Sequence, residues 1–403
     1  MLVIKNATIF EEGVSRVVDV GIDDGHIVKI ANGLESEEVL EASGLYLLPG
    51  IIDLNVRFKD DTLSAEYIKR VQKKAKKSGV TTFAMMPDFT PHIESDTFMQ
   101  LLEEKLDAGM LLALKGLKVT DTDKLNNIST LLGSGAKMIQ ENSHINGNLL
   151  RRILQYALMK KVPFFCFCDN PDLNDNGVMH EGVTSSKLGL AGISKVSEIS
   201  EVAKVAAMAE YYGAKTHFQS ISTAKSLDII ARAKHNNADI SAEVSIFHLI
   251  LNDEACADFN TLAKIYPPLR DEGARKKMIE ALQHGKIDTL TSLHASKSFN
   301  SKDVPFNDAA YGVDALEEFL ALCYTYLVKE EIIDMCVLIQ LLSENPAKIL
   351  GEEKLGKIKE GYVADLLLFD PSSSVYHDSS LRGLYQKELL GEVKYTIKQG
   401  VVL

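Results

Sequence analysis

The sequence is poor in the features that would place the chain outside the cell or in a membrane. Its five cysteines are an odd, scattered set, which argues against a disulfide framework and favours a reducing compartment. No apolar run approaches the roughly 18 residues that a membrane span needs. The start, MLVIKNATIF, lacks a basic region followed by a long apolar one, so we expect no signal peptide. We therefore expect a cytoplasmic protein without membrane contact.

Positive charge is scarce relative to negative charge, and the formal net charge is −12. An acidic protein without a basic patch is a poor candidate for binding nucleic acid or an anionic membrane. The basic stretch from Lys69 to Lys77 alternates with apolar residues, which is typical of the solvated face of a helix. We expect no nucleic-acid partner.

Compact motifs for phosphate or metal binding are also missing. The chain contains neither GxGxxG nor GxxxxGK[ST], the loops that cradle nucleotide phosphates. It contains no HxH, HExxH or CxxC, and its ten histidines are scattered. Neither nucleotide binding nor a local metal motif is indicated.

Both ends of the chain are rich in short strand patterns. Residues 1–48 contain LVIKNATIF, VVDVGI and HIVKI, and Asp24-Gly25 is a hairpin signal between the last two. The tail has the same texture in ADLLLFD and VKYTIKQGVVL. We therefore predict a small β-sandwich domain built from residues 1–49 and 346–403, which flank a central domain of residues 50–345.

The middle of the chain alternates strand and helix patterns. Eight strand candidates follow one another: IIDLNV, TTFAMMP, LLALKGL, AKMIQE, PFFCFC, AKTHFQSI, ISAEVS and IDTLTSL. Helical periodicity lies between them, for instance over residues 65–78, 199–212 and 224–234. Eight alternations predict an α/β protein with a (β/α)8 barrel of the TIM type rather than an open doubly wound sheet.

In such a barrel the chemistry sits at the carboxyl ends of the strands. Because side chains alternate along a strand, each strand end should present a defined set toward the barrel axis. The predicted inward sets are Ile51, Asp53, Asn55 and Arg57 in the first strand, Phe165, Phe167 and Asp169 in the fifth, and Thr289, Thr291 and Leu293 in the eighth.

Several segments resemble dihydroorotase and its cyclic-amidohydrolase relatives. They run in order through nearly the whole chain: LPGIIDLNVRFKD (48–60), MMPDFTP (85–91), CDNPDL (168–173), EGVTSSKLGLAGIS (181–194), AEVSIFHLIL (242–251), KIYPPLR (264–270), GKIDTLTSLHA (285–295), ENPAKILG (344–351) and GYVADLLLFDP (361–371). The resemblance implies an amidohydrolase barrel with one or two divalent metals, zinc in this family, together with a small β-sandwich.

The family's chemistry depends on its metal. A bound metal lowers the pKa of water from ~15.7 to ~7 and polarises the scissile amide carbonyl. At ~1.36 kcal/mol per pKa unit, that shift lowers the free-energy cost of forming hydroxide by on the order of 12 kcal/mol.

The resemblance places the family's metal ligands on residue types that bind metals poorly here. The His-x-His after the first strand is Asn55-Val56-Arg57, and an amide is a feeble ligand while a guanidinium is none. The histidines that end strands five and six are Phe167 and Ser220.

Only one carboxylate remains among these positions. The Asp that ends strand eight in the family, both ligand and general base, is Leu293, whereas Glu141 stands where the family carries its bridging acidic group after strand four. The sequence therefore predicts that the metal ligands are lost, that the chain uses no metal cofactor, and that no catalytic set is intact.

Other candidate ligands are explained better as structural residues. Cys166 and Cys168 share the strand face opposite to Phe167, so they should pack under the helices. By the same alternation, His217 should point outward, away from the barrel axis. His248 is expected to be structural.

Four further positions are candidates for lining the pocket. The family's carboxylate-binding Arg is Lys59, cationic but without a bidentate fork, and the Asn of its MPNT segment is Asp88. A carboxylate there would repel an anionic substrate such as dihydroorotate. The Asn of the NPPLR loop is Tyr266, and His294 matches a histidine beside the catalytic Asp.

The vacated centre still needs charge balance. Arg57 and Glu141 should both point inward, so we hypothesise that they form a salt bridge in place of the metal. The alternative is that each contacts water or other groups.

Three functions remain open at this point. The first is a non-catalytic, structural or regulatory homologue, for which the resemblance suggests aspartate carbamoyltransferase as partner and membership of a homo- or hetero-oligomer. The second is an enzyme of altered chemistry that uses Glu141, Asp88, Lys59 or His294 for acid–base work. The third is weak dihydroorotase activity with an adventitious metal.

Overall fold

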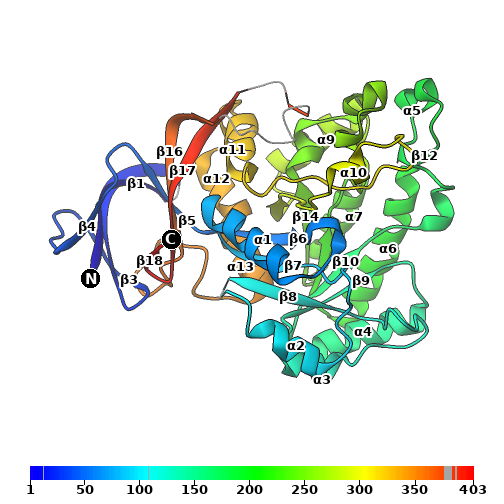
Figure 1. Cartoon of the computed structure of the whole chain (residues 1–403), viewed down its shortest axis with the longest axis horizontal. Helices are drawn as coiled ribbons and strands as arrows, with labels where there is room; N and C mark the ends of the chain where they lie inside the picture. The colour runs from blue at the N-terminus through cyan, green and yellow to red at the C-terminus, as the bar shows by residue number, and fades with distance from the viewer. Residues whose placement is uncertain (12, 108, 376–383, 386–387) are drawn as a thin grey trace.

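Two eight-stranded sheets organise the molecule, with the sheet of the chain ends at the left of Figure 1 and the barrel at the right. The computed structural model describes residues 1–11, 13–107, 109–375, 384–385 and 388–403. Among these residues, no helix is both long enough and apolar enough to cross a bilayer.

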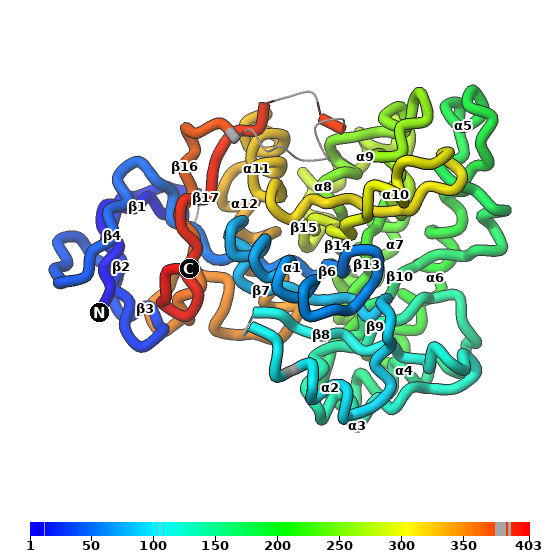
Figure 2. Tube along the Cα trace, viewed as in Figure 1, coloured from blue at the N-terminus to red at the C-terminus, as the bar shows by residue number. Residues whose placement is uncertain are grey.

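Strands from both ends of the chain share the first sheet, whose order is β18-β17-β16-β5-β1-β2-β3 with β4 beside β1. The two ends of the trace accordingly lie together in Figure 2. Its strands are β1 (Leu2–Glu11), β2 (Val14–Asp23), β3 (His26–Ala31), β4 (Glu38–Glu41), β5 (Tyr46–Pro49), β16 (Leu366–Val375), β17 (Leu389–Lys398) and β18 (Val401–Val402). The predicted union of the two ends in one β unit is confirmed.

A tight turn at Asp24-Gly25 joins β2 to β3, as the sequence predicts. The φ angles are 44° at Asp24 and 74° at Gly25, the left-handed conformation that a type I′ hairpin requires at both central positions. Alternate side chains of the sheet, such as Ile4, Val20 and Leu366, pack into a core of their own.

The second sheet is the barrel, and its strands follow one another in chain order. They are β6 (Ile51–Val56), β7 (Val80–Met85), β8 (Met110–Lys115), β9 (Met138–Asn142), β10 (Phe164–Phe167), β13 (Thr216–Gln219), β14 (Ile240–Ser245) and β15 (Thr289–Thr291). All eight predicted strands are found, and the sequential parallel order rules out the doubly wound alternative. The Arg57 N–H donates to the His294 carbonyl over 2.8 Å and draws the last strand toward the first.

Helices lie between the barrel strands and cover them. They are α1 (Ala65–Lys77), α2 (Asp96–Glu103), α3 (Ile128–Gly133), α4 (Gly147–Lys160), α5 (Val183–Leu188), α6 (Lys195–Tyr212), α7 (Ala224–His235), α8 (Ile246–Ile250), α9 (Glu272–Gln283), α10 (Phe299–Lys302), α11 (Phe319–Cys323), α12 (Met335–Ile339) and α13 (Asn345–Leu350). Local signals set their ends: Ser64 accepts the Tyr67 N–H at the start of α1, and Gly213, with φ 68°, ends α6.

The first barrel strand departs from simple alternation. Its pairing with β7 shifts register between Ile51 and Ile52 and again between Asp53 and Val56. Ile51 therefore packs in the core between strands and helices, whereas Ile52 joins the apolar interior of the barrel. The prediction that Ile51 shares an inward face with Asn55 is wrong, because strict alternation does not hold along the whole of this irregular strand.

A buried carboxylate ties the two strands at the barrel seam. Asp53 is fully buried and accepts hydrogen bonds from the Thr291 hydroxyl (2.6 Å) and from the N–H (3.2 Å) and hydroxyl of Ser292. Burial raises the pKa of Asp53 to about 6, although the hydrogen bonds from Ser292 and Thr291 act to lower it. The seam therefore holds a proton more tightly than an unfolded chain would.

This proton predicts a pH dependence of stability. Between the ordinary pKa of 3.8 and about 6, the folded state binds more protons at Asp53 than the unfolded state, so stability falls as pH rises. The contribution over the whole window is on the order of 3 kcal/mol. Relative to wild type, Asp53→Asn should gain stability from pH 4.5 to about 6 in denaturant unfolding, and the difference should level off toward pH 7. A difference that stays constant across this range contradicts the assignment.

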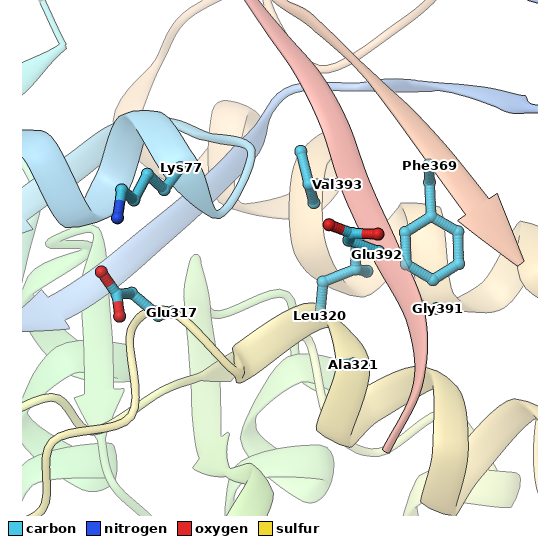
Figure 3. A pocket seen from close by; sticks show the side chains of 8 residues that line it. All are labelled: Lys77, Glu317, Leu320, Ala321, Phe369, Gly391, Glu392 and Val393. Carbon is cyan, nitrogen blue, oxygen red and sulfur yellow. The ribbon is translucent and has the colours of Figure 1, made fainter. Parts of the chain in front are cut away.

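In the sheet of the chain ends, close packing leaves no room for a side chain at Gly391. A cavity of about 270 Å³ lies between α1, α11 and the strands β16 and β17, and Figure 3 shows Gly391 and the Phe369 ring on its wall. A methyl group added at Gly391 would lie 1.9 Å from the Phe369 ring, and φ at Gly391 is 88°. The ring cannot retreat easily, because it packs edge-on against Tyr324 at 5.0 Å.

Two glycine substitutions distinguish the cost of the clash with Phe369 from the cost of placing alanine at a positive φ. Gly391→Ala should lower the free energy of unfolding by at least about 2 kcal/mol more than Gly44→Ala. Both glycines have positive φ, but a methyl group at Gly44 meets nothing within 4 Å, so that variant reports the cost of backbone conformation alone. Equal losses in chemical denaturation would show that the Phe369 contact is unimportant.

Candidate active site

An open cleft of about 590 Å³ lies where the carboxyl ends of the barrel strands meet. Among the positions singled out in the sequence, the residues that line it are Arg57, Asp88, Phe167, Asp169, Tyr266 and Leu293. The candidate site residues that do not line it are Asn55, Lys59, Glu141, Ser220 and His294.

Beneath the cleft, Asn55 is held by hydrogen bonds to other strands. Its side-chain N–H groups donate to the Glu243 carboxylate (2.6 Å) and to the Ser220 hydroxyl (2.9 Å). The other oxygen of Glu243 lies 3.2 Å from Nε2 of His217. Sequence reasoning missed Glu243, although a carboxylate within the apolar strand ISAEVS was a signal that a buried partner must exist.

His217 points into the barrel, so the predicted outward orientation is wrong. Its ring lies 4.7 Å from the ring of Phe165, which belongs to the apolar interior of the barrel. The predicted orientation assumes that side chains alternate without interruption from His217 to Ser220. However, β13 ends at Gln219 and Ser220 has a φ of 50°, so strand alternation does not extend to that residue.

Arg57 forms its ion pair with Asp88. One guanidinium nitrogen donates to the Asn55 amide oxygen (2.7 Å) and the other to Asp88 (3.2 Å). Among the described residues, no ion pair joins Arg57 to Glu141, so the predicted Arg57–Glu141 salt bridge is wrong. Glu141 pairs instead with Lys115, whose ammonium lies 3.5 Å from its carboxylate.

Lys115, which the sequence analysis did not single out, comes from the end of β8 between β7 and β9. Its ammonium donates to Asp88 (2.8 Å) and to the Gln140 amide oxygen (3.0 Å). Glu141 is also fixed by the backbone N–H groups of Leu117 (2.8 Å) and its own neighbour Asn142 (2.9 Å). A lysine ending the otherwise apolar run LLAL was the available signal.

The protonation states follow from these contacts. Burial acts to raise the pKa of Asp88, but Lys115 and Arg57 outweigh it and hold the pKa at about 2. Burial likewise acts to lower the pKa of Lys115, yet Asp88 and Glu141 raise it overall. Asp88 is therefore a carboxylate and Lys115 an ammonium at neutral pH, so neither is poised to exchange protons there.

Apolar and aromatic groups cover the ends of strands five and eight. Phe167 packs on Tyr266 with ring centroids 5.7 Å apart, and Tyr266 packs edge-on against Tyr311 at 5.0 Å. Burial raises the pKa of the Tyr266 phenol, so this group stays neutral. Leu293 lines the cleft with a φ of 53°, a rare conformation for a leucine.

Two histidines near the barrel ends, His294 and His248, are buried in hydrogen-bonded positions. His294 is buried, and its Nδ1 accepts the N–H groups of Ala315 and Leu316 at 3.3 Å each. Burial lowers its pKa to about 4, so the ring is neutral. Burial has the same effect on His248, whose Nε2 lies 3.1 Å from the Pro267 carbonyl.

The two cysteines considered as possible metal ligands, Cys166 and Cys168, face away from the cleft. Cys166 and Cys168 are buried in the core between strands and helices, as the sequence predicts, with their sulfurs 3.9 Å apart. Within the described part of the chain, no group of three or more His, Cys, Asp or Glu side chains is arranged to hold a metal ion. The donors left at the family's ligand positions are the Asn55 amide, the Ser220 hydroxyl and the internally paired Glu141, a set that fits a divalent metal poorly.

Comparisons with known proteins agree with this architecture. The model of the amidohydrolase family matches residues 46–403. Proteins named dihydroorotase from Ruminiclostridium cellulolyticum and Carboxydothermus hydrogenoformans are each 32% identical, over 99% and 100% of this chain and 97% of their own lengths.

Solved structures share the fold at lower identity. The L-hydantoinase (dihydropyrimidinase) of Arthrobacter aurescens superposes with a TM-score of 0.88 at 19% identity, covering 100% of this chain and 95% of that one. The dihydropyrimidinase of Brevibacillus agri gives 0.83 at 20% identity, over 99% and 94%. The family match over most of the chain and the dihydroorotase relatives show that the chain belongs to the amidohydrolase family.

Proposed function

We propose that this chain is a dihydroorotase-like protein that has lost its metal ligands and does not catalyse dihydroorotate hydrolysis. The observation that carries the proposal is the network beneath the cleft. Asn55 is occupied by Glu243, Ser220 and Arg57, so its amide oxygen already accepts a hydrogen bond from a cation. A guanidinium beside that oxygen repels a divalent ion.

The remaining positions support the same conclusion. Phe167 and Leu293 offer no ligand atom and no base, and Phe167 is packed against Tyr266. Glu141 accepts two backbone N–H groups and pairs with Lys115. Without a metal, hydroxide at neutral pH is less accessible by on the order of 12 kcal/mol, a factor of about 10⁹ in rate.

The cleft also has little means of gripping an anionic ring. Dihydroorotate carries a carboxylate, and the cleft presents Asp88 with its charge on the wall. Two cations line the cleft, and each is already paired: Arg57 with that carboxylate and Lys297 with Asp61. A substrate carboxylate would therefore have to displace Asp88 or Asp61 to gain an ion pair.

We propose a structural or regulatory role in an oligomer, with aspartate carbamoyltransferase as the partner. The choice of partner rests on the similarity to proteins named dihydroorotase. Such a role requires a stably folded barrel but no catalytic activity.

A second candidate is hydrolysis of another cyclic amide by metal-independent chemistry. The observation in its favour is the open cleft of about 590 Å³, which has room for a small ring beside Asp88 and Tyr266. In this case Glu141 or Asp88 would act as the base, despite their ion pairs with Lys115.

Metal analysis and activity assays test the proposal. The purified protein should contain no stoichiometric zinc or manganese and should not turn over dihydroorotate, even with either metal added, because its centre lacks ligands. The Ruminiclostridium cellulolyticum dihydroorotase, assayed in parallel, is the positive control.

Stoichiometric metal together with turnover of dihydroorotate contradicts the main proposal. Turnover of a different cyclic amide without metal, abolished in Glu141→Gln or Asp88→Asn, would favour the second candidate instead.

Co-purification tests the proposed partner. A tagged form of this chain, expressed with the aspartate carbamoyltransferase of the same organism, should retain the transferase through size-exclusion chromatography as one stoichiometric complex. The variant Arg57→Ala, altered only inside the cleft, should retain it equally well, since the proposed role depends on outer surfaces. Separate elution of the two proteins would refute the partnership.

A further inference from the structure

The Lys115 ammonium lies in a cage of oxygen atoms. Asp88 Oδ1 is 2.8 Å away, Gln140 Oε1 is 3.0 Å away and Glu141 Oε1 is 3.5 Å away. The Lys115 side chain is 17% exposed and that of Glu141 only 4%. Three oxygens from the ends of the two strands that flank β8 thus surround one largely buried positive charge.

The orientation of Gln140 gives independent support. This side chain is fully buried, and its amide nitrogen has no hydrogen-bond partner. Its amide oxygen, by contrast, receives the Lys115 ammonium. Burying an unpartnered N–H group is costly, so the contact between oxygen and cation must compensate for it. The amide is oriented as a ligand to a positive charge.

The charges at this centre balance only when Lys115 is included. Arg57 and Lys115 supply two positive charges, and Asp88 and Glu141 supply two negative ones. Without Lys115 the sum is −1, at a depth where water screens charge poorly. Arg57 cannot take over its role, because it contacts Asp88 and lies on the cleft wall without an ion pair to Glu141.

We propose that Lys115 is the resident cation of this barrel, and that its ammonium occupies a cation site built from Asp88, Gln140 and Glu141. Removal of the lysine side chain should open that site to an inorganic cation. Carboxylate and amide oxygens are ligands for hard cations such as Mg²⁺ and Mn²⁺. The inference extends the proposed function, since a lysine that fills this site leaves no room there for a metal.

Substitution of Lys115 tests the inference with Mn²⁺ as the probe. Lys115→Ala should melt at a lower temperature than wild type in EDTA, and MnCl2 should restore part of the loss through one bound ion, seen by isothermal titration and by electron paramagnetic resonance. Adding Glu141→Gln should weaken Mn²⁺ binding by about tenfold or more, since one ligand charge is lost.

Lys297→Ala is the matched control. The Lys297 side chain also lies at the cleft and is 7% exposed, but within the described ranges of the chain its one ion-pair partner is Asp61. Neither this variant nor wild type should gain a Mn²⁺ site or a Mn²⁺-dependent rise in melting temperature. Mn²⁺ binding by wild type in the cleft, or a folded Lys115→Ala variant that ignores Mn²⁺, overturns the inference.

A folding defect would also be informative. If Lys115→Ala does not fold, Lys115→Ala/Glu141→Gln returns the centre to zero net charge and should fold again; failure of this double variant overturns the inference. These readouts are independent of turnover, so their failure leaves the non-catalytic proposal standing. Turnover of dihydroorotate by wild type would refute that proposal without touching the Lys115 measurements.

Discussion

Charge neutrality at the centre of a barrel is the constraint on which the cleft depends. A carboxylate held away from water is tolerated only when a cation and hydrogen-bond donors surround it. Here the cations belong to the polypeptide: Arg57 and Lys115 reach Asp88 from strand ends on either side of it, and Lys115 also reaches Glu141. The strand ends, the loops after them and the shape of the cleft are all arranged around this self-contained balance.

The changes at the strand ends depend on one another. Asn55 donates to Glu243, which also contacts His217, so an amide in the first strand completes the bonding of a carboxylate in the seventh. Phe167 has Tyr266 to pack against, and Leu293 takes its place beside the seam that Asp53 ties. Asn55, Ser220, Glu243 and His217 bond to one another below the cleft, which favours a fixed structure over a centre waiting for a ligand.

Sequence periodicity was sufficient for the fold but not for the contacts in the cleft. The eight strands, the hairpin at Asp24-Gly25 and the helix end at Gly213 follow from local rules of alternation, turn chemistry and capping. Local rules fail where the backbone departs from the ideal, as at the register shifts of β6 and the positive φ of Ser220. The partner of Glu141 could not be predicted, because three neighbouring strand ends compete for the same space.

The sheet shared by the two chain ends constrains how the protein is made. β5 pairs with β16, and more than 300 residues of barrel separate them, Pro49 opposing Leu366 in the ladder. During translation the first five strands emerge with this edge unpaired, and it stays unpaired until β16 has been made. Completion of the sheet therefore follows synthesis of the whole barrel. A truncated polypeptide would carry an open strand edge, a marker by which quality control can distinguish unfinished copies.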